Sequence, residues 1–387
     1  MNIRLVLFTA VFLLFSTSSH AQTWQLLWAD EFDYTGYPDS YRWRPDVWAP
    51  GTTNQELQAY TASPNNANVS GGTLKITATA AYNSSKGKND YWSARLNSTA
   101  SWTYGRFEAR MKLPGGYGTW PAFWLYPDNE AYYGGSWPNA GEIDIMEEVG
   151  YDPNVIHATL HSKCCNHALG NARTNTITVA NPYDWHVYSV DWFPDHIQFF
   201  VDGQLYYEVW NDGSGWQSWP FNHNFHFILN LAVGGTWGGT MGVDPNIWPK
   251  TLEIDYVRAY KLDSLVEAEK YSDMKGVTIE STSDTGAGKN VGSIDSGDWM
   301  TYSLNVPAAG NYRISYRVAS PNTGGVIKLE KAGGGVTYGT VAVPKTGGWQ
   351  TWQTVSHTVS LPAGAQKIGV VATTGGFNFN WIKIERL

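Results

Sequence analysis

Apolar and polar residues alternate along much of this chain, which is the pattern of β-strands that bury one face. Residues 107–113 alternate strictly between apolar and charged side chains, and residues 312–318 alternate between apolar and polar ones. Turn signals such as Asp202-Gly203 separate the segments, and segments with a helical period are nearly absent. The pattern predicts an all-β protein built from antiparallel sandwiches. One face of a longer strand is marked by five apolar residues: Phe225, Phe227, Leu229, Leu231 and Val233.

Two domains are expected, because 387 residues are more than most single domains contain. A short break falls at residues 262–265, and after it Gly, Thr and Val become more frequent while acidic residues become fewer. We therefore expect a larger sandwich over residues 22–261 and a smaller one over residues 266–387.

Residues 1–21 have the features of an export signal. Arg4 supplies a positive charge, residues 5–15 form an apolar run, and Ser19-His20-Ala21 fits a cleavage site. The run is too short to span a membrane, and no later segment qualifies. We expect a secreted protein, either extracellular or periplasmic.

The chain is acidic and rich in aromatic residues. Its formal net charge of −8 and its 16% of charged residues argue against nucleic acid or an anionic membrane as a partner. The 20 Trp and 23 Tyr exceed what a core needs. Flat aromatic rings stack on sugar rings, and their N–H and O–H groups bond hydroxyls. The composition favours a polysaccharide partner, and we expect a monomer.

The stretch with the clearest chemistry is residues 142–147, Glu-Ile-Asp-Ile-Met-Glu. In a strand, Glu142 and Asp144 share one face. Glu147 has the wrong parity unless a β-bulge near residues 145–146 absorbs one residue. Without a bulge, Glu148 would take its place. Carboxylates clustered on one open face raise at least one pKa, and sugar hydrolysis needs one ionised and one protonated carboxyl.

The next strand can be paired with this one. A turn at about residues 150–154 places Glu147 opposite His157 and, past the bulge, Glu142 opposite His161. Both histidines then lie on the carboxylate face. His161 is the stronger candidate for a site residue, and His157 the weaker one.

Residues 24–261 resemble glycoside hydrolase family 16, and within it the laminarinases, which are endo-β-1,3-glucanases. The resemblance rests on an ordered set of motifs, and no single one of them would suffice. They are WADEF (28–32), NQELQ (54–58), YGRFEAR (104–110), WPAFW (120–124), WPNAG (137–141), HATLH (157–161), LNLAVGG (229–235) and IDYVR (254–258).

The resemblance implies a catalytic jelly-roll sandwich and a retaining mechanism. Glu142 would be the nucleophile and Glu147 the acid and base, while Asp144 would help to hold their pKa values apart. From residue 162 onward the sequence departs from the Gly-rich turn of many laminarinases. The resemblance therefore does not predict the aglycone side of the cleft or its fine specificity. The implied substrate-binding residues are Trp120, Trp124, Trp137, His161, Asn54, Arg95 and Trp237.

Residues 266–387 resemble carbohydrate-binding module family 6. The matching pieces are VEAEKY (266–271), GDW (297–299), GGWQTW (347–352) and NFNW (378–381). By this resemblance Trp349 would be the sugar platform and Asn378 a hydroxyl-binding residue. The family often has a second aromatic residue where Ser293 stands here.

No cofactor is expected for catalysis, but the resemblance implies structural calcium in each domain. Asp255 matches the calcium ligand of the first domain. In the module the matching residues are Glu267, Glu269 and Asn380. Hard oxygen ligands suit calcium, although solvated acidic residues would look the same in sequence.

Cys164 and Cys165 are the only cysteines and are adjacent. They could form a vicinal disulfide, remain thiols or bridge two chains. Zinc binding is disfavoured, because two adjacent thiolates lack the usual ligand spacing. A feature of the local loop is the favoured reading.

We expect a secreted retaining endo-glycosidase that hydrolyses β-1,3-glucan. The alternatives are a hydrolase of mixed-linkage β-1,3-1,4-glucan, agarose or carrageenan, or a non-catalytic glucan-recognition protein. Such recognition proteins lack the catalytic carboxylates, whereas this chain keeps all three.

Overall fold

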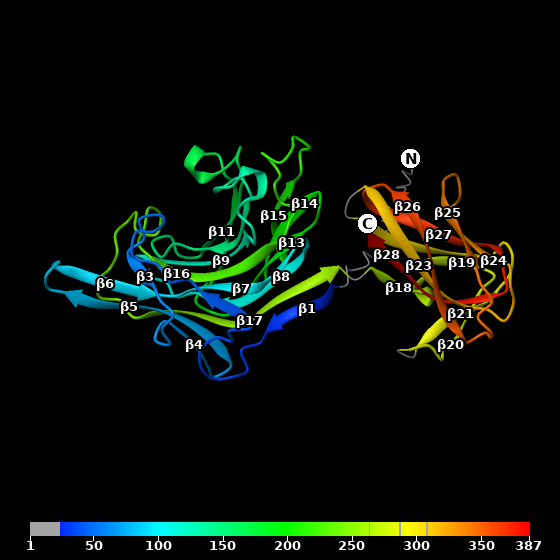
Figure 1. Cartoon of the computed structure of the whole chain (residues 1–387), viewed down its shortest axis with the longest axis horizontal. Coiled ribbons are helices and arrows are strands. Elements are labelled where there is room, and N and C mark those ends of the chain that lie inside the picture. Colours follow the sequence, from blue (N-terminus) through cyan, green and yellow to red (C-terminus); the bar gives the residue numbers. More distant parts are fainter. Residues whose placement is uncertain (1–23, 263, 286–287, 307–308) are drawn as a thin grey trace, which may run out of the picture.

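The computed structural model describes residues 24–262, 264–285, 288–306 and 309–387, and this part of the chain is almost entirely β (Figure 1). The predicted all-β class is confirmed. The described helical segments are three short 3-10 turns: η1 (Tyr132–Gly134), η2 (His167–Leu169) and η3 (Ala268–Lys270). The expected export signal, residues 1–21, lies outside the described residues. Within them, no helix has the length and apolar character needed to cross a membrane.

The first domain consists of two packed sheets, which we call the outer sheet and the cleft sheet. The outer sheet has the order β15 (Gln204–Trp210), β14 (His196–Val201), β13 (His186–Trp192), β8 (Gly105–Lys112), β17 (Lys250–Leu262), β5 (Thr73–Asn83), β6 (Lys88–Ser93) and β3 (Gln58–Tyr60), with β1 (Trp24–Asp30) beside β17 and β4 (Ala67–Ser70) beside β5. The cleft sheet has the order β12 (Arg173–Thr178), β11 (Val155–His161), β10 (Glu142–Glu147), β9 (Thr119–Pro127), β16 (Phe225–Val233), β7 (Arg95–Trp102) and β2 (Trp43–Pro45).

The core lies between these two sheets. In β8, Phe107, Ala109 and Met111 are fully buried, while the charged residues between them face outward. The five apolar residues predicted to mark one face of β16 are all buried in the same core. The other face of β16, which includes Asn230 and Ala232, borders the cleft described below. Strand parity therefore separates core residues from site residues, as the alternation predicts.

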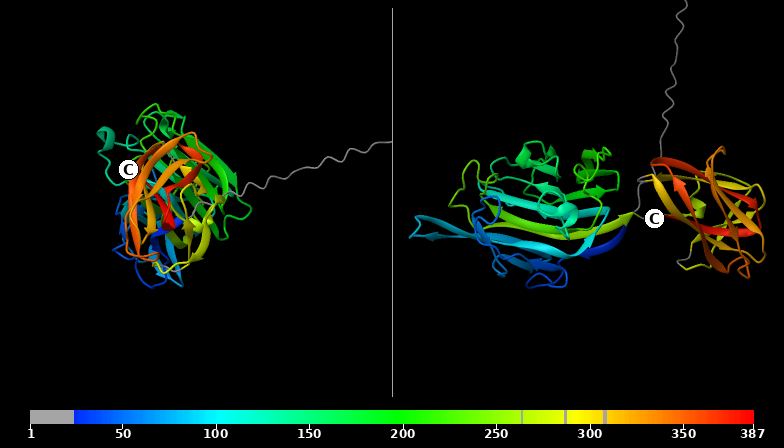
Figure 2. Two further views of the ribbon diagram at one scale, coloured as in Figure 1. Left: turned by 90° about the vertical axis from the view of Figure 1, so that its right-hand side faces the viewer. Right: turned by 45° about the horizontal axis from the view of Figure 1, so that its top comes forward.

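The second domain is a smaller pair of sheets with its own core of buried side chains, including Tyr302, Tyr316 and Phe379. Figures 1 and 2 show the two domains end to end, joined after β17. One sheet has the order β20 (Thr278–Ser281), β21 (Lys289–Ile294), β28 (Phe377–Arg386), β23 (Gly310–Ala319) and β26 (Trp352–Leu361), with β18 (Leu265–Glu267) beside β28. The other has the order β19 (Asp273–Lys275), β22 (Trp299–Val306), β27 (Gly364–Thr374), β24 (Gly325–Lys331) and β25 (Thr337–Val343).

Candidate active site

The strand that carries the three carboxylates contains a β-bulge. In the pairing of β10 with β11, Glu142 lies opposite His161, Asp144 opposite Thr159 and Glu147 opposite His157. Three residues are thus spanned on β10 for two on β11, and the register against β9 shifts at the same point. The bulge and both histidine partners are confirmed. The extra residue leaves Ile145 and Met146 buried and turns Glu147 to the face of Glu142.

This face forms one wall of a cleft with a volume of about 800 Å³. Glu142, Asp144 and Glu147 line the cleft, and Glu148 does not. The side chain of Glu148 is fully buried instead, so the alternative in which it takes the place of Glu147 is wrong. All the implied substrate-binding residues of the first domain line the same cleft: Asn54, Arg95, Trp120, Trp124, Trp137, His161 and Trp237.

Two of the implied substrate-binding tryptophans each donate a hydrogen bond to one of the two glutamates. Nε1 of Trp137 donates to Oε2 of Glu142 at 3.0 Å, and Nε1 of Trp120 donates to Oε1 of Glu147 at 2.9 Å. Each glutamate therefore has one oxygen fixed by an indole. Trp137 and Trp120 thus line the cleft and also orient the two glutamates. The motifs alone did not indicate this second role.

Asp144 lies between the two glutamates and is only 3% exposed. Its Oδ2 is 3.2 Å from Nε2 of His161, which also lies 3.7 Å from Oε1 of Glu142. Burial raises the pKa of Asp144 well above its ordinary range, and the carboxyl shares a hydrogen bond with Glu142. The same three side chains bring one potential metal-ligand atom each to within 4.8 Å of one another. A cation bound there would contact Glu142 and Asp144, two of the three carboxylates on β10.

Burial is the largest cause that raises the pKa of both glutamates to about 8, and the neighbouring Asp144 is the second. Three neighbouring carboxyls, one buried and two half-buried, do not all ionise at neutral pH, because each negative charge raises the pKa of the others. The cluster therefore retains at least one proton at neutral pH. Glycoside hydrolysis by a carboxyl pair needs one protonated and one ionised carboxyl. The pKa values and the indole partners are alike for Glu142 and Glu147, so neither separates their roles, and the division into nucleophile and acid stays the one that the resemblance implies.

A hydrogen-bond network that sequence reasoning missed supports the platform Trp124. Nε1 of Trp124 donates to Asn230, whose amide donates to the hydroxyl of Tyr60, which in turn donates to Glu56. Gln58 donates to the same oxygen of Glu56 at 2.7 Å. Burial raises the pKa of Glu56, which also lines the cleft. Glu56 and Asn230 stand inside motifs quoted for the resemblance, so their positions were visible and only their roles were not.

Arg95 lies in the cleft wall, but its charge is directed at its neighbours in the protein. The guanidinium carbon is 4.3 Å from the ring centroid of Trp48 and 4.7 Å from that of Trp124. Nε lies 2.9 Å from a carboxylate oxygen of Asp46. Arg95 therefore fixes two aromatic walls by cation–π contact, which adds to the hydrogen bonding to sugar hydroxyls expected from sequence.

The remaining rim residues pack as a group. Nδ2 of Asn54 donates to Oε1 of Glu56 at 3.3 Å, which ties the Asn54 loop to the network below it. Trp237 meets the ring of Trp120 edge-on at 5.4 Å and the ring of His157 at 4.9 Å. The weaker histidine candidate thus lines the cleft as part of an aromatic cluster.

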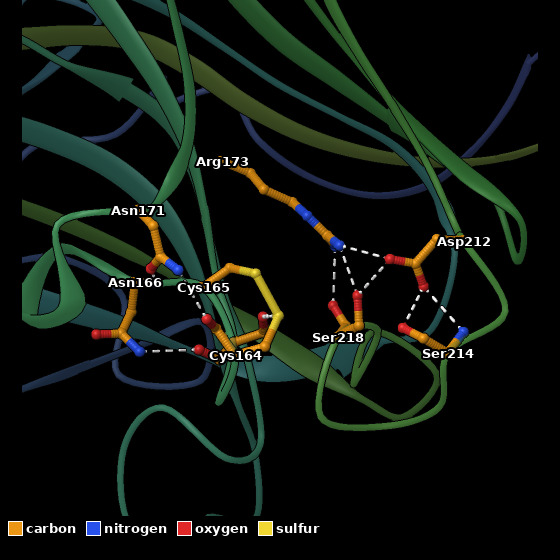
Figure 3. Close-up of a disulfide and its surroundings, with 9 residues drawn as sticks. Cys164, Cys165, Asn166, Asn171, Arg173, Asp212, Ser214 and Ser218 are labelled. Atoms are coloured by element: carbon orange, nitrogen blue, oxygen red, sulfur yellow. Dashed lines mark hydrogen bonds and ion pairs between the residues drawn. A yellow bond between two sulfur atoms is a disulfide. The ribbon is translucent and has the colours of Figure 1, made fainter.

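The adjacent cysteines form a vicinal disulfide (Figure 3), one of the three states left open by the sequence. The backbone N–H of Cys164 donates to the carbonyl of Gln217, which attaches this loop to residues 211–220. The loop continues into η2, where the ring centroid of His167 lies 4.8 Å from that of Trp137 and 5.1 Å from that of His161. The departure from the Gly-rich turn therefore builds the cleft wall on the side of Glu142.

The two calcium expectations meet different surroundings. Oδ2 of Asp255 accepts a hydrogen bond from the guanidinium of Arg110 at 2.7 Å. This carboxylate is therefore paired with a positively charged side chain. In the module, Oε2 of Glu269 and Oδ1 of Asn380 are buried without a hydrogen-bond partner. Carbonyl and carboxylate oxygens are the ligands that a hard cation such as calcium prefers. Calcium in either domain stays a prediction.

The two sugar-binding residues implied for the module are neighbours. Trp349, in the loop between β25 and β26, is 48% exposed, which confirms the expected exposed ring. Asn378 is buried below it and donates to the Trp349 carbonyl at 2.9 Å and to Glu280 at 2.6 Å. Asn378 therefore holds the Trp349 loop in place.

Glu148 gives a pH-dependent prediction for stability. Burial raises its pKa to about 7. Because the pKa of Glu148 is higher in the folded than in the unfolded state, its contribution to the free energy of unfolding is fully present below about pH 4.5. This contribution is lost as the pH rises through 7. In thermal unfolding, Glu148→Gln should gain stability relative to the parent as the pH rises from 4.5 to 8, by on the order of 1–3 kcal/mol. Glu142, Asp144 and Glu147 are present in both proteins, so their pH-dependent contributions cancel in the difference in stability. A difference that stays constant with pH would contradict the prediction.

Comparison with known proteins gives a consistent result for both domains. Residues 53–258 match the family described as glycosyl hydrolases family 16, and residues 267–386 match carbohydrate binding module (family 6). A β-glucanase of Rhodothermus marinus is 49% identical over 253 residues, which are 63% of this chain and 87% of that protein. A glucan endo-1,3-β-glucosidase of Cryptopygus antarcticus is 36% identical over 61% of this chain and 92% of its own length. The crystal structure of the Rhodothermus marinus laminarinase aligns with a TM-score of 0.60, over 62% of this chain and 99% of that one.

Proposed function

Because the chain belongs to the family 16 glycosyl hydrolases, we propose that this β-glucan hydrolase is exported to the periplasm or the medium and cleaves β-1,3-glucan internally, with retention of anomeric configuration. The observation that carries the proposal is the bulge in β10. It turns Glu142 and Glu147 into one cleft and leaves each with one oxygen held by an indole.

The reaction proceeds by double displacement. Glu142 attacks the anomeric carbon, the bond to the leaving glucan oxygen breaks, and Glu147 gives that oxygen its proton. Glu147, now ionised, takes a proton from water, which attacks the same carbon and releases Glu142. Asp144 and His161 lie against Glu142 and hold it in place during both steps. Two inversions at one carbon give net retention.

The choice of an uncharged β-1,3-glucan rests on the charge of the cleft and on relatives. Its described lining residues include seven carboxyls but only two arginines, so the cleft offers few cations to bind the sulfate groups of a sulfated galactan. Relatives named as glucan endo-1,3-β-glucosidases are 36% and 37% identical to this chain. Mixed-linkage glucan remains the second candidate, since an endo-1,3-1,4-β-glycanase of Rhizobium meliloti is 33% identical.

Support for export comes from the predicted signal and from the Cys164–Cys165 disulfide, because disulfides persist mainly in oxidising compartments. Detection of the mature protein in culture medium or periplasm, with its N-terminus beginning near residue 22, tests this part. Recovery from the cytoplasm with the first 21 residues intact would contradict it.

A glycan panel tests the substrate. Release of reducing ends should be fastest from β-1,3-glucan, slower from mixed-linkage glucan, and undetectable from agarose and carrageenan. The distribution of products should show internal cleavage. Preferential hydrolysis of mixed-linkage glucan would transfer the assignment to the second candidate. The matched control is Glu142→Gln, which should release nothing from any glycan in the panel.

A further inference from the structure

The molecule carries one exposed tryptophan on each domain. All 20 tryptophans lie in the described part of the chain, and only Trp210, at 56%, and Trp349, at 48%, are largely exposed. Trp349 belongs to the module whose binding role is already expected. Trp210 ends β15, the edge strand of the outer sheet, and no part of the proposed mechanism uses it.

Strand pairing places Trp210 on a face that the cleft does not reach. In the register of β14 with β15, Ile197 and Phe199 are buried in the core, so their neighbours His196 and Gln198 point away from it. Trp210 pairs with His196, and Glu208 pairs with Gln198, on that outward face. No residue of β14 or β15 is among the described residues that line the cleft.

The ring of Trp210 is held rigidly from behind. It stacks on His196 with ring centroids 4.4 Å apart and an interplanar angle of 17°. His196 stacks in turn on Phe193 at 4.5 Å and is oriented by a hydrogen bond to Asp195 at 2.8 Å. One indole face is therefore covered by protein, and the exposed area belongs to the rest of the ring.

Polar groups surround the edge of this ring. Nε1 of Trp210 donates to one oxygen of Glu208 at 2.8 Å, and the amide of Gln198 donates to the other at 2.6 Å. A single exposed apolar residue is ordinary on a protein surface. A rigid indole with a carboxylate and an amide fixed beside it is different, since it offers an apolar face together with hydroxyl-binding groups.

We propose that Trp210 is the platform of a surface glycan-binding site on the catalytic domain, separate from the cleft. The site takes a pyranose ring of an uncharged β-glucan chain, with Glu208 and Gln198 bonding its hydroxyls. This inference rests on the proposed function for its ligand class. A protein partner fits less well, because specific interfaces bury about 800 Å² on each side and the residues next to Trp210 on its face, Gln198 and Glu208, are polar. Glu208 also disfavours an anionic ligand.

Together with Trp349, such a site would hold one glucan chain or particle at two places. Binding at a second place raises the effective concentration of the enzyme at an insoluble substrate without a change in the cleft. The consequence is a selective effect on insoluble glucan. Hydrolysis of a short soluble oligosaccharide, which occupies the cleft alone, would be unaffected.

Adsorption of the full-length chain to particles of insoluble β-1,3-glucan tests the proposal. All proteins carry Glu142→Gln so that the particles stay intact. In the Trp349→Ala background, Trp210→Ala should weaken association about five-fold, the equivalent of roughly 1 kcal/mol. Glu208→Ala should weaken it less, because the ring remains. Leu205→Ala is the matched control, since Leu205 is an exposed apolar residue of the same strand and should bind like its parent.

Two outcomes would overturn the proposal. One is adsorption by the Trp210→Ala protein equal to that of its Trp349→Ala parent. The other is a weakened adsorption that accompanies a change from dimer to monomer in sedimentation, which would make Trp210 a self-association contact. If the active enzyme releases no reducing ends from β-1,3-glucan, the proposed function has failed instead. The isotherms are then measured with the glycan that the enzyme does hydrolyse.

Discussion

Replacement of Glu142 by alanine is expected to abolish hydrolysis, with a loss in kcat on the order of 10⁴-fold or more. The substitution removes the group that attacks the anomeric carbon but leaves the acid Glu147 with its indole partner. It also opens a space on the side of the sugar opposite the leaving group. Added azide should enter this space, attack the anomeric carbon of an aryl β-glycoside and restore turnover. Because one inversion occurs, the product should be the α-glycosyl azide, identified by NMR.

Glu148→Gln is the matched control for this experiment. Its side chain is buried outside the cleft, so activity should stay close to that of the parent and azide should have no effect. A loss of activity in Glu148→Gln as large as that in Glu142→Ala would reverse the assignment made from the bulge. Formation of the β-glycosyl azide by Glu142→Ala would show that this glutamate is not the nucleophile.

Glu147→Ala should lower the rate on polysaccharide by about 10²–10⁴-fold, the contribution of a general acid and base. The loss should depend on the leaving group, because an activated aryl glycoside needs no proton to depart. With such a substrate the ester on Glu142 should form and then accumulate, since no base remains to activate water. A burst of aryl alcohol followed by slow turnover, measured by stopped flow, is the expected signature.

Azide distinguishes this variant from the first. It needs no general base, so it should attack the accumulated ester directly and accelerate turnover. The product has undergone two inversions and should be the β-glycosyl azide. The two variants therefore predict opposite anomers from one substrate. The same anomer from both would refute the division of roles, whatever the loss in rate.

Much of the catalytic strand was predictable because its information is local. Parity along residues 142–147 required a bulge if Glu147 was to join Glu142, and a short hairpin then fixed His161 and His157 opposite them. Alternation likewise predicted which residues of β8 and β16 are buried. Side-chain direction in a strand follows from position alone, so a few residues of sequence suffice.

Contacts between distant segments could not be predicted in this way. Asn230 and Tyr60 are 170 residues apart, yet their hydrogen bond joins Trp124 to Glu56. The resemblance implied that Arg95 binds substrate, but its cation–π contacts with Trp48 and Trp124 became visible only in the fold. Asp255 was expected at a calcium site and is met by Arg110, 145 residues away. Each of these depends on which strands become neighbours.

The amino-acid sequence by itself determined the all-β class, the face that Glu142 and Asp144 share and the family, since these follow from periodicity and from ordered local motifs. The structure decided between Glu147 and Glu148, because it shows where the bulge lies. The tertiary structure alone decided which indole fixes which glutamate, how far burial raises their pKa values, and which of 20 tryptophans stay exposed. The physical reason is that desolvation and hydrogen bonding depend on every atom around a group. Those atoms come from strands far apart in the chain, and only the packed sheets bring them together.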